Sequence, residues 1–297
     1  MQAGRAFRRP WGRRLAAALL PLLLTACQAK PAVEARPAMW LVADDDTRIY
    51  MLGTMHALPA GTDWDAGKVA AAIGQADTLM LELSPQQLAE AGAVFRDLAP
   101  REAPLAIGAR LPAKALAGYR ALEADEPFGG DGLDDWAVLV LMGQRVAQHA
   151  DLSPADGVEA GLTAAFRRAG KPIHGLESAK AQLMLFERLD PATQRALLVR
   201  AAANIDHAEQ DARAMAAAWS RGDAAALAKI VNEDVDAVPA ARKALLTDRN
   251  RRWTAWVERR LDQPGTVLMA VGAGHLVGDD GVPTMLAAAG YKVVRVQ

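Results

Sequence analysis

The sequence predicts an α/β fold with a mostly parallel central sheet, an N-terminal hairpin and a large helical cap. Short apolar segments typical of buried strands alternate with helical segments, which is the order expected of a parallel sheet. Segments 39–42 and 47–52 flank an Asp-rich turn, as the strands of a hairpin would. Helical segments exceed what is needed to connect the strands, so the excess is expected to form a cap. A composition of 52% apolar and 23% charged residues is typical of a globular chain.

Residues 1–26 have the pattern of a bacterial secretory signal. Five arginines precede the apolar run Leu15–Leu24 as a positively charged region. The ten residues of this run are too few to span a bilayer, which needs roughly 20. The segment ends in Leu-Thr-Ala-Cys, which resembles a lipobox, and Cys27 is the single cysteine of the chain. We expect lipidation at Cys27 and a membrane anchor, which makes the protein a periplasm-facing lipoprotein. Gln28 after it favours the outer membrane of a Gram-negative bacterium.

Residues 27–38 are rich in Pro and Ala, which is typical of a tether, and residues 39–297 are expected to form a single domain. Further strands are expected at 78–83, 171–176, 265–271 and 290–296. We expect the last of these strands to pair beside the one before it. Helices are expected over 64–76, 134–149 and 178–262, the last broken near Pro191, Gly222 and Pro239.

The charge balance and the absent motifs exclude several classes of function. The chain has 34 basic and 35 acidic residues, and the signal contributes five arginines and no acid, so the rest is acidic overall. An acidic domain argues against a nucleic-acid partner. The chain has no Gly-rich phosphate loop and no Gly-x-Ser-x-Gly, so neither a nucleotide cofactor nor a serine nucleophile is expected.

Two of the expected strands run directly into the pattern Gly-x-x-His. These are Gly53 to His56 and Gly272 to His275. Ligands of parallel sheets bind beyond the carboxyl ends of the strands, where both histidines are expected to lie. Gly53 and Gly274 would let the backbone approach a substrate closely. The alternative is that both histidines are turn residues that donate to backbone carbonyls.

Two glutamates join the histidines. Glu82 interrupts an apolar strand and Glu177 ends another, although each could also be the structural partner of a buried arginine. Imidazole and carboxylate groups together suit Zn, Mn or Co, and a bound metal lowers the pKa of its water to near 7. We expect His56, His275 and Glu82 to bind such a metal, with Glu82 or Glu177 accepting the proton of the water.

These motifs resemble the TraB/GumN family, whose relatives are the Tiki membrane proteases and, more distantly, proteins of the erythromycin-esterase-like fold. The matching blocks are Leu52–His56, Leu79–Leu83, Gly170–Ser178, Arg249–Asn250 and Val271–Gly278, in that order over about residues 39–297. The Gly-Ala-Gly-His-Leu sequence that begins at Gly272 is the most specific of them.

The resemblance implies a TraB/Tiki-like, metal-dependent hydrolase with His56, His275, Glu82 and Glu177 in its site. The Arg-Asn pair of the family corresponds to Arg249 and Asn250. Arg249 would hold an anionic group or stabilise an oxyanion, and Asn250 would bind substrate. Tiki members cleave peptides with manganese or cobalt, so a peptide or amide bond in the cell envelope is the expected target.

Two other functions are compatible with the same residues. One is a metal-free esterase-like hydrolase, in which a histidine activates water directly and a glutamate assists it. The other is a non-catalytic lipoprotein that sequesters a peptide or another envelope-derived ligand.

Overall fold

The computed structural model of the chain describes residues 33–124 and 126–297. The expected signal peptide, the expected lipidation site Cys27 and the first half of the expected tether lie outside the described residues. Across the part of the chain that is described, every helix is too short or too polar to pass through a membrane.

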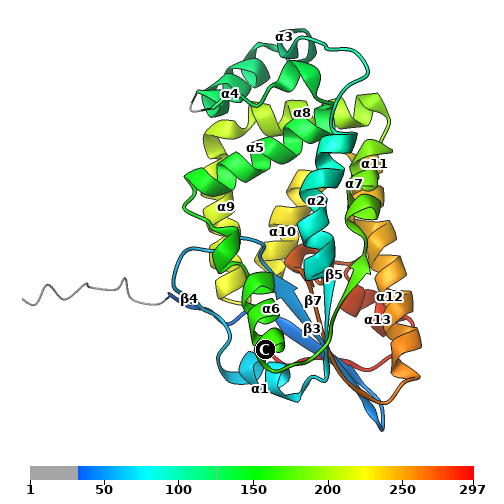
Figure 1. Cartoon of the computed structure of the whole chain (residues 1–297). Helices are drawn as coiled ribbons and strands as arrows, with labels where there is room; N and C mark the ends of the chain where they lie inside the picture. Colours follow the sequence, from blue (N-terminus) through cyan, green and yellow to red (C-terminus); the bar gives the residue numbers. More distant parts are fainter. Residues whose placement is uncertain (1–32, 125) are drawn as a thin grey trace, which may run out of the picture. The chain divides into compact units, whose positions relative to one another are not determined.

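A six-stranded sheet forms the centre of the domain, and its topology confirms the predicted α/β class (Figure 1). In order across the sheet, the strands are β6 (Ile173–Glu177), β5 (Thr78–Leu83), β7 (Gly265–Gly272), β3 (Thr47–Thr54), β2 (Met39–Ala43) and β8 (Val293–Arg295). The first four are parallel to one another, whereas β2 is antiparallel to β3 and β8 is antiparallel to β2. The carboxyl ends of four neighbouring strands therefore meet at one edge of the sheet.

Strands β2 and β3 form the predicted N-terminal hairpin. Asp44 closes its turn, because its Oδ1 accepts the backbone N–H of Asp46 at 3.2 Å and of Thr47 at 2.8 Å. Such local acceptance by an aspartate side chain is what favours this residue in turns.

The expected pairing of the last strand is wrong. Strand β8 lies next to β2, with Leu41 opposite Val294, and not next to β7. Both sides of β7 are already occupied by β3 and β5, so β8 can join the sheet only at an edge.

Side chains along the central strands alternate between two cores, because successive residues of a strand point to opposite faces. The helices that cover the two faces are α1 (Gly67–Gln75), α6 (Val158–Arg168), α12 (Asp248–Leu261) and α13 (Val282–Ala288). Leu268 packs on the side of α1 and α6, whereas Val267 and Met269 pack on the side of α12 and α13. Figure 1 shows α6 and α12 on opposite sides of the sheet.

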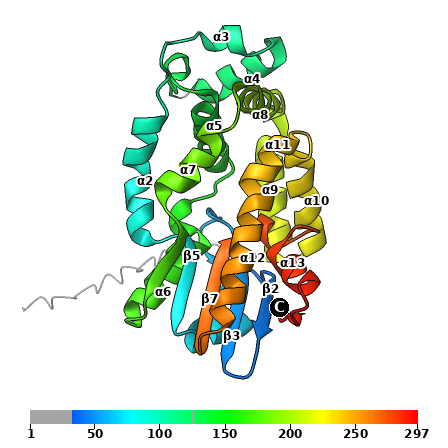
Figure 2. The same ribbon diagram turned by 90° about the vertical axis from the view of Figure 1, so that its right-hand side faces the viewer.

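The remaining helices form the predicted cap beyond the carboxyl ends of the parallel strands (Figure 2). They are α2 (Pro85–Leu98), α3 (Ile107–Arg110), α4 (Ala113–Glu123), α5 (Asp135–His149), α7 (Ala179–Glu187), α8 (Pro191–Ala203), α9 (Ile205–Ser220), α10 (Ala224–Val235) and α11 (Pro239–Arg242). The breaks expected near Pro191, Gly222 and Pro239 are confirmed. A further break at Asn204, between α8 and α9, was not expected from the sequence.

Residues 33–38, which the composition assigns to the tether, are part of the folded domain. Strand β1 (Val33–Glu34) pairs in parallel with β4 (Thr62–Asp63), and Ala35 and Ala38 are buried. Arg36 donates its backbone N–H to the Ser220 carbonyl at 2.7 Å. The small alanine side chains that make this segment resemble a tether are also small enough to pack closely against the domain.

Lys171 holds the start of β6 against the end of α1. Its Nζ donates to the carbonyl oxygens of Gly74 at 2.8 Å and Ala76 at 2.7 Å, which are carbonyls that the end of a helix leaves without partners. This contact fixes β6 beside β5 and so helps to place Glu177, at the far end of β6, in the site described next.

Candidate active site

The histidines and glutamates singled out in the sequence come together at the carboxyl ends of the parallel strands. His56 follows β3, Glu82 lies near the end of β5, Glu177 ends β6, and His275 lies in the short helical turn that follows β7. Arg249, from α12, reaches the same place. The predicted clustering of these side chains is what the topology of the sheet produces.

Three of these side chains converge on one point beside Gly272. A β-carbon placed on Gly272 would lie 3.2 Å from Glu82 Oε1, 3.6 Å from His275 Cδ2 and 3.8 Å from His56 Nε2. Because glycine has no side chain, no atom of Gly272 beyond its backbone lies between these three groups.

Arg249 is the centre of the charged network. Its Nη2 donates to Glu82 Oε2 at 2.6 Å and to Glu177 Oε2 at 2.7 Å, and its Nη1 donates to His275 Nε2 at 3.0 Å. The guanidinium also lies 4.6 Å from the ring centre of Trp253, in a cation–π contact. Arg249, Glu82 and Glu177 are all buried at their side chains, so one cation balances two carboxylates out of water. The structural alternative considered for the two glutamates, a buried arginine partner, is therefore present.

His275 is held as a neutral imidazole. Its Nδ1 donates to Asn250 Oδ1 at 2.6 Å, and the Asn250 amide is oriented by donating to the Asp280 carbonyl at 2.8 Å. Nε2 is then the acceptor that faces Arg249. Burial lowers the pKa of His275 to about 3, which agrees with this tautomer.

Glu82 is an ionised carboxylate with both oxygens in hydrogen bonds. Oε2 accepts from Arg249 and from Gln182 Nε2 at 2.9 Å, and Oε1 accepts the backbone N–H of Gly272 at 2.8 Å. Burial favours the neutral acid, but the charge of Arg249 and the other neighbouring groups, among them the Gly272 N–H, together outweigh it and lower the pKa of Glu82 to about 2. A carboxylate with so low a pKa is a weak base. Glu177 also accepts hydrogen bonds from Arg249.

The partner of His56 is a residue that the sequence did not reveal. Glu159, in the first turn of α6, accepts from His56 Nδ1 at 2.7 Å, and Thr54 donates to the same oxygen. The charge of Glu159 raises the pKa of His56 to about 9, and His56 in turn lowers the pKa of Glu159. No local motif marks Glu159, because it lies more than 100 positions from His56 in the chain and meets it only in the fold.

The three residues expected to bind substrate lie elsewhere. Gly53 packs closely against Ala273, whose Cα would be 3.2 Å from a β-carbon added to Gly53. Gly274 packs in the same way against Val231 of α10. Asn250 is fully buried and orients His275. None of the three is among the described residues that line the cavity beside His56.

The donor set does not fit a metal ion in this arrangement. Within the described ranges, no three His, Cys, Asp or Glu side chains are grouped closely enough to hold one. The reason lies in Arg249, whose guanidinium contacts both His275 Nε2 and Glu82 Oε2 and so takes the place between two of the three expected ligands.

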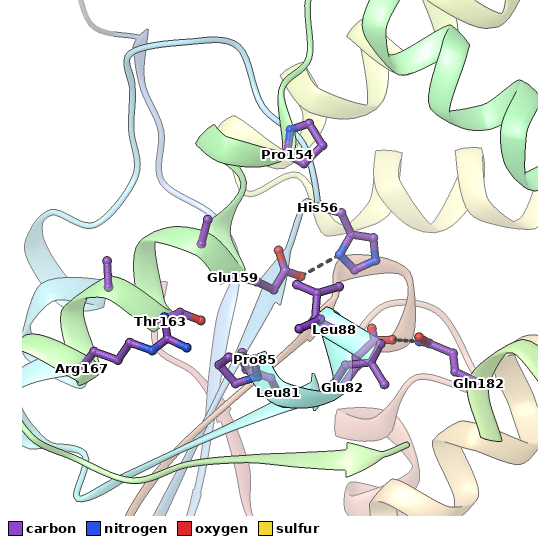
Figure 3. A pocket seen from close by; sticks show the side chains of 14 residues that line it. His56, Leu81, Glu82, Pro85, Leu88, Pro154, Glu159, Thr163, Arg167 and Gln182 are labelled. Carbon is purple, nitrogen blue, oxygen red and sulfur yellow. Dashed lines mark hydrogen bonds and ion pairs between the residues drawn. The ribbon is translucent and has the colours of Figure 1, made fainter. Parts of the chain in front are cut away.

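A cavity of about 680 Å³ opens in front of this cluster (Figure 3). One wall comes from α2, with Pro85, Leu88 and Ala89, and the other from α6, with Ala160, Thr163, Ala164 and Arg167. His56, Glu82, Glu159 and Gln182 lie together at one end (Figure 3). The cavity is thus apolar along its length and charged where the histidine lies, as small-molecule and peptide sites commonly are.

The family of the chain follows from comparison with known proteins. No curated protein matches the sequence. The model of the TraB/PrgY/gumN family matches residues 38–295, which include every residue of the cluster around Arg249 and both walls of the cavity. This match confirms the resemblance seen in the sequence. The chain therefore belongs to the TraB/PrgY/gumN family.

Proposed function

We propose that this protein is a hydrolase that cleaves a peptide or amide bond in the cell envelope, with water activated by His56. One observation supports the proposal above the others. His56 Nε2, the Glu82 carboxylate and the His275 ring all lie within 3.8 Å of the position that a β-carbon on Gly272 would take, at the charged end of a largely apolar cavity. A site of this kind has a base, an anion and a place for water in front of a surface that can bind substrate.

The pair of His56 and Glu159 supplies the base. Glu159 accepts the Nδ1 proton, so deprotonated His56 has its Nε2 lone pair free for a water molecule. His56 takes a proton from that water, and the water oxygen bonds to the carbonyl carbon of the substrate. The C–N bond then breaks while His56 transfers the proton to the leaving nitrogen. The carboxylate of Glu159 stabilises the imidazolium between the two transfers.

Two other side chains assist this reaction. Gln182 lines the cavity and uses one N–H of its amide for Glu82, which leaves its second N–H for the oxyanion of the reacting carbonyl. Arg249 is not among the described residues that line the cavity, so it is a positioning residue that holds Glu82 and Glu177 and not the oxyanion donor expected from the resemblance.

A metal-dependent form of the same hydrolysis is the second candidate. It is favoured by the protonation states of the cluster, because His275 is neutral and Glu82 is ionised, as Zn, Mn or Co would require of its ligands. His56, His275 and Glu82 would then hold the ion, and Arg249 would have to leave both His275 and Glu82.

Peptide cleavage by the purified protein tests the proposal. A mixture of unstructured peptides is incubated with the wild-type protein and with His56→Ala, with and without exhaustive EDTA, and the products are identified by mass spectrometry. We expect cleavage that survives EDTA and falls by roughly 10²–10⁴-fold in His56→Ala. Loss of cleavage in EDTA, restored by Mn, Co or Zn, would select the metal-dependent form. Peptides that bind but stay intact would show a sequestering protein instead.

We further propose that the protein faces the periplasm from a lipid anchor at Cys27, most simply in the outer membrane. The support is the lipobox pattern of the sequence alone. Fractionation of cells that express the wild-type chain or Cys27→Ser tests it, and the variant should leave the membrane fraction. A wild-type chain already found in the soluble fraction would contradict the anchor.

A further inference from the structure

The cavity has opposite charges at its two ends. Glu82 and Glu159 lie at the end with His56, whereas Arg167 is the only Lys or Arg among the described residues that line the cavity. Figure 3 shows Arg167 at the end of α6 that is remote from His56. No hydrogen bond or ion pair of the Arg167 side chain is found within the described part of the chain, so its charge is available to a ligand.

Helix α6 sets the distance between these two ends. Glu159, Thr163 and Arg167 follow one another at intervals of four residues, so they lie along one face of the helix, which lines the cavity. With a rise of about 1.5 Å for each residue, Arg167 lies roughly 12 Å along the helix axis from Glu159, the partner of His56. An extended peptide covers about 3.3–3.6 Å for each residue, so this distance corresponds to three or four residues.

The walls between the two ends are apolar. Leu88 projects from α2 with 62% of its surface exposed, and Ala160 and Ala164 line the cavity from α6. A substrate that covers this stretch with apolar side chains would remove Leu88 from water.

From this arrangement we infer that the cavity selects peptides with a carboxylate three or four residues from the cleaved bond and apolar residues between, and that Arg167 binds the carboxylate. The inference rests on the proposed function, because His56 defines the end from which the distance is counted.

Calorimetric binding of synthetic peptides to His56→Ala tests the inference without cleavage. The probes are acetylated, amidated peptides of Ala and Leu with a single Glu, the same peptides with Gln, and Gln peptides with a free carboxyl end. We expect the Glu peptide to bind about 5-fold more tightly than the Gln peptide, the contribution of one partly exposed ion pair. The free-carboxyl peptide shows whether the chain terminus serves as well as a side chain.

Substitutions of α6 supply the decisive comparison. In the His56→Ala background, Arg167→Ala should remove the preference for Glu. Arg167→Glu should reverse it, so that the same peptide with Lys in place of Glu binds more tightly than the Glu peptide. Arg168→Ala should leave the preference unchanged, because Arg168 is exposed and does not line the cavity. Equal binding of Glu and Gln peptides, or a preference that survives Arg167→Ala, would overturn the inference.

Cleavage separates this inference from the proposed function. If the wild-type protein prefers Glu peptides but leaves them intact, the role of Arg167 is supported and the proposal of a hydrolase is contradicted. Cleavage without any charge preference would support the hydrolase and contradict the role of Arg167. Where cleavage occurs, mass spectrometry should place the Glu three or four residues from the new terminus, and a random spacing would contradict the distance set by α6.

Discussion

Substitution of Gly272 by alanine separates the chemistry of the site from the stability of the fold. The backbone at Gly272 has φ −46° and ψ 131°, so its φ is negative and does not itself require a glycine. Its new methyl group, however, would occupy the point on which Glu82, His275 and His56 converge, with the closest atom, Glu82 Oε1, at 3.2 Å. The variant therefore adds a methyl group among the three side chains that, in our proposal, surround the attacking water.

The two expected effects differ in size. Crowding at 3.2 Å costs about 1–3 kcal/mol, and the smaller entropy of the unfolded alanine chain offsets about 0.4–1 kcal/mol of this. The free energy of unfolding should therefore fall by no more than about 2.6 kcal/mol. Activity should fall by at least about 100-fold, because displacement of a reacting group by about 1 Å has an effect of that order.

Gly274→Ala is the matched control. Its β-carbon would also meet its closest neighbour at 3.2 Å, but that neighbour is Val231 Cγ2 of α10 and not a side chain of the site. Urea unfolding and kcat/KM are measured for both variants on one cleaved peptide. Both should lose similar stability, and Gly272→Ala alone should lose activity. An active Gly272→Ala, or equal losses of activity in the two variants, would show that water does not react beside Gly272.

Two further predictions concern the charges of the site. Arg249→Met leaves the buried carboxylates of Glu82 and Glu177 without their shared cation, so urea unfolding should show a loss of about 3–5 kcal/mol. Arg252→Met, which removes an exposed partner of Glu177, should cost less than about 1 kcal/mol. Equal losses in the two variants would contradict the central role of Arg249. The second prediction is that kcat/KM rises with pH through the raised pKa of His56, because only the deprotonated imidazole accepts a proton from water. In Glu159→Gln the residual activity should have its midpoint closer to 6.5, and a rate that falls with rising pH over this range would assign His56 to proton donation instead.

The sequence predicted those parts of the fold and site that depend on short-range patterns. Apolar strands followed by Gly-x-x-His placed His56 and His275 correctly at the end of a parallel sheet, and Glu82 and Glu177 followed from their positions in neighbouring strands. The hairpin was equally predictable, because the acceptor of its turn, Asp44, lies within three residues of both donors.

What the sequence could not predict depends on contacts between distant segments. The position of β8 is decided by which edge of the sheet is free, and this is known only once β5 and β3 have paired with β7. Glu159 is one of many glutamates in helical segments, and only the approach of α6 to the end of β3 distinguishes it.

The metal prediction stays a prediction, and the position of Arg249 illustrates the same limit. Histidine and glutamate at strand ends are the ligand types that a divalent metal prefers, and the sequence supplied three of them in His56, His275 and Glu82. Which cation lies between these side chains depends on how the fold places other charged residues beside them. Arg249 reaches the cluster from α12 and donates to two of the three, a contact that residue types alone do not reveal.

The role of the His56–Glu159 pair is tested most directly by kcat/KM of Glu159→Gln on a peptide that the wild-type protein cleaves in EDTA. Glutamine keeps the size and one acceptor oxygen of the side chain but removes the charge that stabilises the His56 imidazolium. We expect kcat/KM to fall by roughly 100-fold or more, with the unfolding midpoint little changed. Wild-type activity in this variant would contradict the assignment of His56 and Glu159 as the base that activates water.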